Sequence, residues 1–252
     1  MLKTFLVDGD KGGIGKTMVS RIITDAYVRH EATRLPAAKI ICLDADRTNP
    51  DFAGAGGYGV DEYIFTTGLV NLDDPENWME MMNMMEPYLE MSQTEAVRII
   101  ISLPATIQRA FTTGSEAIGQ AMEMLNAVPV WVVGDTQDSV MQLEKRIELM
   151  PRSFQHGVVV LNQKFGARDK FVHWNGSQIQ KDIIESGEWI ETTIPVLGAA
   201  TARRLGRTPL HVAEATRTGF NGEKLGLGDL IAVKSFRTVA TVDVACVEKM
   251  GG

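Results

Sequence analysis

The sequence predicts an α/β fold: a doubly wound, mostly parallel sheet with helices on both faces, in a single domain over residues 1–252. Short apolar runs of strand length alternate with segments whose apolar residues recur at helical spacing, which favours right-handed crossovers and a parallel sheet. No linker rich in Pro, Gly or Ser and no internal repeat divides the chain. The composition, 44% hydrophobic and 23% charged, is typical of a globular protein with a sizeable core.

The first thirty residues predict a strand, a glycine-rich turn and a helix, in that order. Residues 2–7 form a short, largely apolar run, and apolar residues recur at helical spacing over 18–30. The turn between them reads Lys11-Gly12-Gly13-Ile14-Gly15-Lys16-Thr17. Its glycines let successive N–H groups point inward, and the helix N-terminus adds partial positive charge, so the turn forms a phosphate cradle. Lys16 would reach the β- and γ-phosphates, and the Thr17 hydroxyl would ligate Mg²⁺.

A pair of carboxylates marks a second functional element. Residues 39–44 read as a strand, and Asp44 and Asp46 stand at its end. The carboxyl end of a parallel strand, beside the phosphate cradle, is where open α/β sheets bind their ligands. The alternative is that both are solvated acids that merely end the strand.

Further apolar runs predict the other strands, and helical periodicity predicts helices among them. The strands cover residues 98–104, 129–135, 157–162 and 189–196, and the helices cover 139–149, 210–215 and 229–250. Asn162 ends one of these strands, where its amide can both donate to and accept from an adenine edge. The alternative is a turn-forming Asn before Gln163.

Residues 53–95 are the least typical part of the chain, because a glycine-rich stretch is followed by acidic, methionine-rich sequence. Methionine adapts to irregular surroundings, so a methionine cluster on a helix forms either core or a docking face. Met81, Met84, Met85 and Tyr88 follow helical spacing, which favours core.

The phosphate-cradle motif departs from the general pattern G-x-x-x-x-G-K-[ST], because Asp10 stands in place of the first glycine. With Lys11 opening the motif, the stretch resembles the deviant Walker A loop, K-G-G-x-G-K-[ST], of ParA/MinD-type P-loop ATPases. The order of motifs resembles that family over nearly all of the chain. Met18 after the motif, and the run Asn-Pro-Asp-Phe at 49–52, are similar to the ParA-like TraL proteins of conjugative plasmids.

The resemblance implies a P-loop NTPase fold that uses ATP and Mg²⁺. The implied nucleotide-binding residues are Gly12, Gly13, Ile14, Gly15, Lys16, Thr17, Met18, Asn162 and Pro195. Thr17 would hold the metal directly, and Asp44 would act in its outer sphere. Asp46 would position the attacking water, so that the implied catalytic residues are Lys11, Lys16 and Asp46.

One departure from the family concerns hydrolysis. Members usually carry Asp at the end of the strand that matches residues 98–104, and this chain has Ser102 there. A serine hydroxyl can bond a metal-bound water but brings no charge, so we expect nucleotide binding with slow hydrolysis. The family also implies that two chains sandwich two nucleotides, with Lys11 of each reaching the other's phosphates. We therefore expect an ATP-dependent homodimer.

Charge is unevenly placed along this acidic chain, whose formal net charge is −7. Acids dominate the first 150 residues, so any contact with a polyanion belongs in the second part. Arg203, Arg204 and Arg207 are the candidates for non-specific, salt-sensitive DNA binding. The alternative is that they cap helices or pair with acids of the first half.

The resemblance implies an ATP-driven switch that positions or segregates plasmid DNA, or recruits a conjugal transfer complex, together with an adaptor or cargo protein. The alternatives are a MinD-like protein-positioning regulator, a protein-docking switch without direct DNA contact, and a metabolic P-loop enzyme. Reductase-type relatives hold an iron–sulfur cluster through paired cysteines, which Cys42 and Cys246 do not offer.

Nothing in the sequence points to a membrane or to export. The longest apolar runs fall short of the roughly 20 residues that span a bilayer, and the first residues lack the regions of a signal peptide. The helix predicted over 229–250 has few cations, and acids dilute them, which is a poor match to a membrane-surface helix. We expect a cytoplasmic protein.

Overall fold

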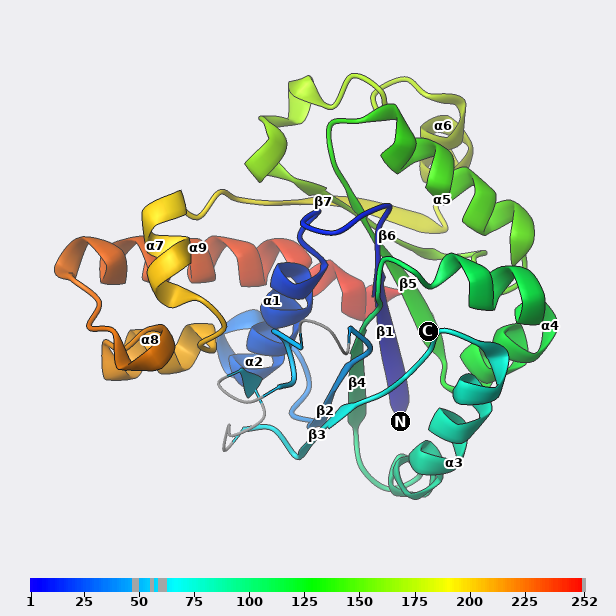
Figure 1. The fold of residues 1–252 in the computed structure, drawn as a ribbon, viewed down its shortest axis with the longest axis horizontal. Helices are drawn as coiled ribbons and strands as arrows, with labels where there is room; N and C mark the ends of the chain where they lie inside the picture. Colours follow the sequence, from blue (N-terminus) through cyan, green and yellow to red (C-terminus); the bar gives the residue numbers. More distant parts are fainter. Residues whose placement is uncertain (47–49, 55–56, 59–62, 251–252) are drawn as a thin grey trace.

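The computed structural model describes residues 1–46, 50–54, 57–58 and 63–250 (Figure 1). The strands of this part of the chain form a seven-stranded sheet in the order β3-β2-β4-β1-β5-β6-β7, with every neighbouring pair parallel. Their bounds are β1 Leu2–Asp8, β2 Lys39–Asp44, β3 Thr66–Leu69, β4 Val97–Ser102, β5 Ala127–Val133, β6 Gly157–Asn162 and β7 Trp189–Ile194. The predicted sheet is therefore confirmed, with β1 at its centre.

Helices cover both faces of the sheet, so the fold has three layers (Figure 1). One face packs against α3 Pro75–Met91, α4 Gln108–Met124, α5 Gln137–Leu149 and α6 Gln178–Glu185. The other packs against α1 Lys16–Val28, α7 Ala199–Leu205, α8 Leu210–Thr216 and α9 Leu227–Val244. The short α2, His30–Thr33, follows α1.

The central strand shows why the apolar runs are continuous instead of alternating. All seven residues of β1 are buried. Leu2 and Leu6 pack toward α3–α6, whereas Phe5 and Val7 pack toward α1 and α9. Because helices cover both faces, successive side chains enter one core or the other. Because β1 is the central strand, its carboxyl end lies in the middle of the edge where open parallel sheets bind their ligands.

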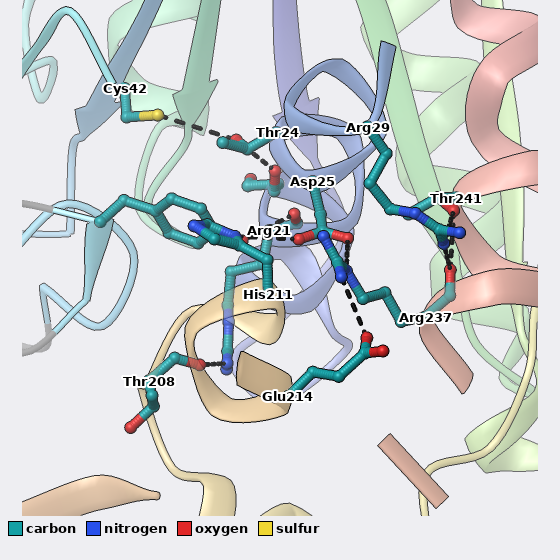
Figure 2. A network of polar contacts seen from close by, with 12 residues as sticks. Arg21, Thr24, Asp25, Arg29, Cys42, Thr208, His211, Glu214, Arg237 and Thr241 are labelled. Carbon is teal, nitrogen blue, oxygen red and sulfur yellow. Dashed lines mark hydrogen bonds and ion pairs between the residues drawn. The ribbon is translucent and has the colours of Figure 1, made fainter. Parts of the chain in front are cut away.

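A buried network of charges fixes α8 and α9 to α1 (Figure 2). Asp25 of α1 is fully buried, and its carboxylate lies 3.1 Å from Nδ1 of His211 and 2.5 Å from Nε of Arg237. Arg237 also pairs with Glu214 at 3.0 Å. An unpaired buried charge is strongly destabilising, so these contacts hold the three helices in one arrangement. That arrangement places the loop between α7 and α8 next to the phosphate cradle.

The structure differs from the sequence prediction in several places, and the first is the last helix, which is predicted over 229–250 but ends at Val244, before a short 3-10 helix over Ala245–Lys249. The edge strand β3 is not indicated by the sequence, because it has four residues, two of them Thr and one Gly. In α3, Met81 and Met85 are core residues as predicted, but Met84 is about half exposed, so the prediction is wrong for Met84. Adjacent residues on a helix are separated by about 100°, so Met84 lies about 100° from Met85 and about 60° from Met81, beyond the edge of the buried stripe.

In the described part of the chain, no helix has the length and apolar character needed to cross a bilayer.

Candidate nucleotide-binding site

The glycine-rich turn between β1 and α1 has the backbone of a phosphate cradle. Gly13 and Gly15 adopt left-handed backbone angles, with φ of 77° and 114°. A Cβ atom at Gly12 or Gly13 would meet nothing within 4 Å, so the turn faces open space. Gly15 is the N-cap of α1 and provides no side-chain hydrogen bond to the helix. The first N–H groups of the helix therefore lack a side-chain cap, and an anion would find donors and partial positive charge there.

Lys16 is held close to the turn. Its side chain is buried, and Nζ donates to the Lys11 carbonyl oxygen at 3.1 Å. Burial lowers the pKa of Lys16 below its ordinary 10.5, while Asp8, Asp10 and Asp46 act in the opposite direction. An ammonium group that has lost much of its hydration gains more from an incoming phosphate than a solvated one does.

The residues that open the motif are anchored differently. Asp10, which replaces the usual glycine, accepts a hydrogen bond from the Ser139 hydroxyl of α5 at 3.0 Å. Lys11 lies 3.9 Å from the other Asp10 oxygen, and its side chain is about half exposed. The loop is therefore tied down through Asp10, whereas the Lys11 ammonium remains near the surface.

A cavity of about 420 Å³ lies along the loop and gathers most of the predicted phosphate and metal residues. It is lined by the loop residues Gly12, Gly13, Gly15, Lys16, Thr17 and Met18, and by Arg21, Asp46, Asp51, Ser102, Leu103, Ala105, Gly206 and Arg207. Ser102 reaches it from the end of β4, where it lies beside Val7 of β1 and in register with Asp44 of β2, but the predicted Asp44 is not among the lining residues.

Asp44 performs a structural task that sequence patterns do not reveal. It is buried, and its carboxylate accepts hydrogen bonds from the backbone N–H groups of Asp46, Phe52 and Ala53 at 3.0, 2.9 and 3.4 Å. Burial raises the pKa of Asp44 above its ordinary 3.8, while these three donors oppose the shift. Asp44 thus holds the segment after β2 to the strand end, and the acids of that segment that line the cavity are Asp46 and Asp51.

A second cavity, of about 540 Å³, lies on the other side of the loop. Met18, Gly13 and Gly15 line both cavities. Most of its other lining side chains are apolar: Ile194, Pro195, Val196, Leu197, Ala199, Ala202 and Phe236, with Asn162 and Lys164 as polar members. One side of the loop is therefore suited to charged groups and the other to a flat apolar group.

Asn162 lies between the loop and the second cavity. Its Nδ2 donates to the Ile14 carbonyl at 2.8 Å, and its Oδ1 accepts from the Lys164 backbone N–H at 3.1 Å. The turn-forming role is thus present, and the side chain also braces the loop. Each amide atom retains a second hydrogen-bonding position, so recognition of an adenine edge stays a prediction.

The three arginines predicted to contact DNA have different surroundings. Arg203 is exposed on α7. Arg204 donates through Nε to Asp229 at 2.9 Å, and Nε of Arg207 lies 3.5 Å from Asp51 of the first half. The pairing with the first half that the alternative expects is therefore present for Arg207, whereas Arg204 pairs with an acid of the second half. DNA binding stays a prediction, and Arg203 is its most exposed candidate.

Two supports of the loop escape sequence reasoning. Ile14 is fully buried, and a Cβ at Gly9 or Gly134 would come within 2.9 or 2.5 Å of its side chain. These glycines make room for Ile14, which anchors the exposed loop in the core. At the end of β1, buried Asp8 pairs with Arg146 of α5 at 2.9 Å. The contacts of Ile14 with Gly134 and of Asp8 with Arg146 could not be found from spacing, because these partners are far apart in the chain.

The residues present fit a nucleotide with its magnesium ion better than a metal alone. Within the described residues, no group of three or more His, Cys, Asp and Glu side chains could hold a metal ion. Thr17 and Asp46 line the same cavity as the glycine cradle, and phosphate oxygens would supply the ligands that the protein lacks. The cradle and the uncapped helix start are suited to those phosphates.

Comparisons with known proteins found a related sequence and a similar fold. No family model matches the chain. Protein MobD of Acidithiobacillus ferrooxidans is 26% identical over 185 residues, which cover 73% of each chain. The MinD cell division protein of Aquifex aeolicus matches the fold with a TM-score of 0.50 at 17% identity, over 94% of this chain and 95% of that one.

Proposed function

We propose, on the premise that this chain is a ParA/MinD-type P-loop protein, that it binds ATP with Mg²⁺ and acts as a slowly hydrolysing switch. The observation that carries the proposal is the pair of cavities that meet at the glycine loop. A charged cavity with Lys16 suits the phosphates, and an apolar cavity next to Asn162 and Pro195 suits the base.

Each residue around the phosphates has a distinct task in this proposal. Lys16 and the backbone N–H groups of the loop bind the phosphates, and Thr17 holds the metal ion. Asp44 acts on the metal through water while it continues to hold the segment after β2. Asp46 orients the attacking water, since it lines the cavity directly after β2, whereas Asp51, the other lining carboxylate of that segment, pairs with Arg207.

Hydrolysis is expected to be slow because of Ser102. This residue is buried at the end of β4 and lines the phosphate cavity, in the place where a carboxylate would help to hold the metal shell. A neutral hydroxyl orients water less strongly than a charged acceptor does. A long-lived ATP state suits a switch, because partners then have time to bind the ATP form.

We further propose that the ATP form is a homodimer that serves the positioning or conjugal transfer of plasmid DNA, with an adaptor or cargo protein. The likeness to MobD, over 73% of both chains, supports a role in DNA mobilisation or positioning. The dimer proposal is supported by the position of Lys11, because its side chain is about half exposed and a long lysine side chain at the surface can extend to a second chain.

A second candidate is a nucleotide-dependent protein-docking switch that does not contact DNA directly. The ion pairs of Arg204 with Asp229 and of Arg207 with Asp51 favour it, because they reduce the charge offered to DNA phosphates. The two candidates share the same nucleotide site and differ in what the ATP form binds.

The nucleotide site is tested by calorimetric titration of Mg-ATP into the wild type and Lys16→Ala. Loss of the phosphate-facing charge should weaken binding at least about 100-fold, since a charged hydrogen bond and the local field are both removed. Lys181→Ala is a control for loss of one lysine, because Lys181 is exposed on α6 and outside both cavities. Equal affinity of Lys16→Ala and wild type would refute the phosphate-cradle assignment.

A further inference from the structure

Arg207 belongs to the phosphate end of the site. It lines the same cavity as Lys16, Thr17 and Asp46, and 31% of its side chain is exposed. Its Nε lies 3.5 Å from Oδ1 of Asp51, which lines this cavity too. The Asp51–Arg207 ion pair therefore joins two walls of the cavity, the segment after β2 and the loop between α7 and α8.

The backbone that carries Arg207 is fixed to α1. Buried Arg21 donates through Nη1 to the Gly206 carbonyl at 2.7 Å and through Nη2 to the Thr208 carbonyl. Figure 2 shows Arg21 extending from α1 to Thr208. The Arg207 guanidinium also lies over the ring of Phe220, 4.9 Å from its centre. With the backbone held on both sides of Arg207, the guanidinium is the part that can change partner.

Asp51 is a replaceable partner. Its side chain is 51% exposed, and ion pairs in contact with water contribute little because solvent screens them. Its neighbours are held independently, since Phe52 and Ala53 donate their backbone N–H groups to Asp44. Loss of the pair with Arg207 would therefore leave this segment attached to β2.

We infer that Arg207 is the residue by which this site distinguishes ATP from ADP, exchanging Asp51 for the γ-phosphate. The inference rests on the proposed function, because it needs a nucleotide in the cavity. A γ-phosphate carries more charge than one carboxylate and offers three acceptor oxygens, and a guanidinium binds such a group through parallel hydrogen bonds. ADP lacks that group, so Arg207 stays with Asp51. Binding of the γ-phosphate would therefore release Asp51, in the segment after β2 that also carries Asp46, from its ion pair with Arg207.

The first test compares nucleotides in one variant. Arg207→Gln keeps a polar side chain and removes the charged guanidinium that lies over Phe220. Titration with a non-hydrolysable fluorescent ATP analogue and with fluorescent ADP, both with Mg²⁺, gives two dissociation constants. The analogue should bind about tenfold more weakly, and ADP should change by less than about twofold. Arg152→Gln removes an equal charge from an exposed site outside both cavities, and should change neither constant.

A double-mutant cycle separates partner exchange from simple repulsion. Asp51→Asn should raise affinity for the ATP analogue about threefold in the wild type, because one carboxylate that competes with the γ-phosphate for Arg207 is removed. In the Arg207→Gln background the same change should have no effect. An equal gain in both backgrounds would mean that Asp51 acts only through its field, and would overturn the exchange.

Other outcomes separate this inference from the proposed function. A wild type that binds neither nucleotide refutes the proposed function itself. A wild type that binds both, with an unchanged ratio of the two constants in Arg207→Gln, refutes only the role of Arg207. Thermal melting checks that the variant is folded. If Arg207→Gln is unstable, Arg207→Lys takes its place: a smaller loss confined to the ATP analogue supports the inference, and an unchanged ratio contradicts it.

Discussion

The phosphate cradle and the arginine segment from Arg203 to Arg207 are both predicted from their residue types. The structure has the predicted arrangement in the cradle but not in the arginine segment. In the cradle, the glycines have the left-handed angles that the motif requires, and Lys16 faces the cavity with them. In the arginine segment, two of three guanidinium groups are turned toward acids of this chain. Only Arg203 keeps the exposed position that the prediction assumed.

The difference follows from where the partners lie in the chain. The cradle is built by seven consecutive residues, and its function depends on backbone angles that glycine allows and on the start of the next helix. The partner of Arg204 lies 25 residues away, and that of Arg207 lies in the segment after β2. A cluster of arginines in the sequence suggests binding to an anion. The fold determines which of these arginines already pair with acids of the same chain.

The largest effect is expected at Gly15. An alanine there would take φ of 114° and place Cβ 2.4 Å from Nδ2 of Asn162. The strained angle alone costs about 1–2 kcal/mol, and the loop must also move away from Asn162. Gly15→Ala should therefore melt several degrees lower and lose ATP binding. Gly12→Ala adds the same methyl where nothing lies within 4 Å, and should melt like the wild type. Equal melting of both variants would show that the cradle's geometry does not depend on Gly15.

The same contrast explains how far the sequence predicts this fold. Periodicity located the central strands because helices bury both of their faces, so their apolar runs are continuous. It did not indicate β3, which has four residues at the sheet edge and is not buried. It placed Met84 in the core because spacing identifies a helical stripe only to within one residue's rotation.

In the candidate site, too, some features have a local sequence signature and others depend on contacts between distant residues. The loop residues and the cavity-facing Asp46 follow from motif and strand order. Asp44 could be placed at the end of β2, but its bonds to Phe52 and Ala53 depend on how the chain returns over the strand. The room that Gly134 leaves for Ile14 depends on a contact between distant strand ends. Such contacts have no local signature.

A smaller effect is expected when the arginines are separated. Arg204→Ala should lower the melting temperature by a few degrees, because Asp229, which is 7% exposed, loses its charged partner. Arg203→Ala should leave melting unchanged and, if the ATP form binds DNA, flatten the dependence of log K on log salt by about 0.9. Gel shifts on unrelated duplexes at two salt concentrations give this slope. If Arg204→Ala changed the salt dependence of DNA binding but not the melting temperature, Arg204 would be a DNA-binding residue and not a structural one.

The smallest effect concerns pH. The hydrogen bond from Arg204, followed by that from Thr201, lowers the pKa of Asp229 from 3.8 to about 2. A carboxyl group with a depressed pKa stabilises the fold above its unfolded value, and this contribution is lost as pH falls through the folded value. Asp229→Asn should therefore be less stable than wild type at neutral pH, and the difference should shrink between about pH 4 and pH 2. A difference independent of pH would mean that the carboxylate charge is not what Arg204 recognises.

The central claim, an ATP-dependent switch built on this loop, is tested most directly by light scattering of the purified protein with Mg-ATP and with Mg-ADP. We predict the 27.7 kDa monomer in ADP and twice that mass in ATP for the wild type. Lys11→Ala should bind ATP yet remain largely monomeric, because its ammonium is the group proposed to reach the partner's nucleotide. A wild type that stays monomeric in ATP, or a Lys11→Ala variant that dimerises like the wild type, would contradict the account.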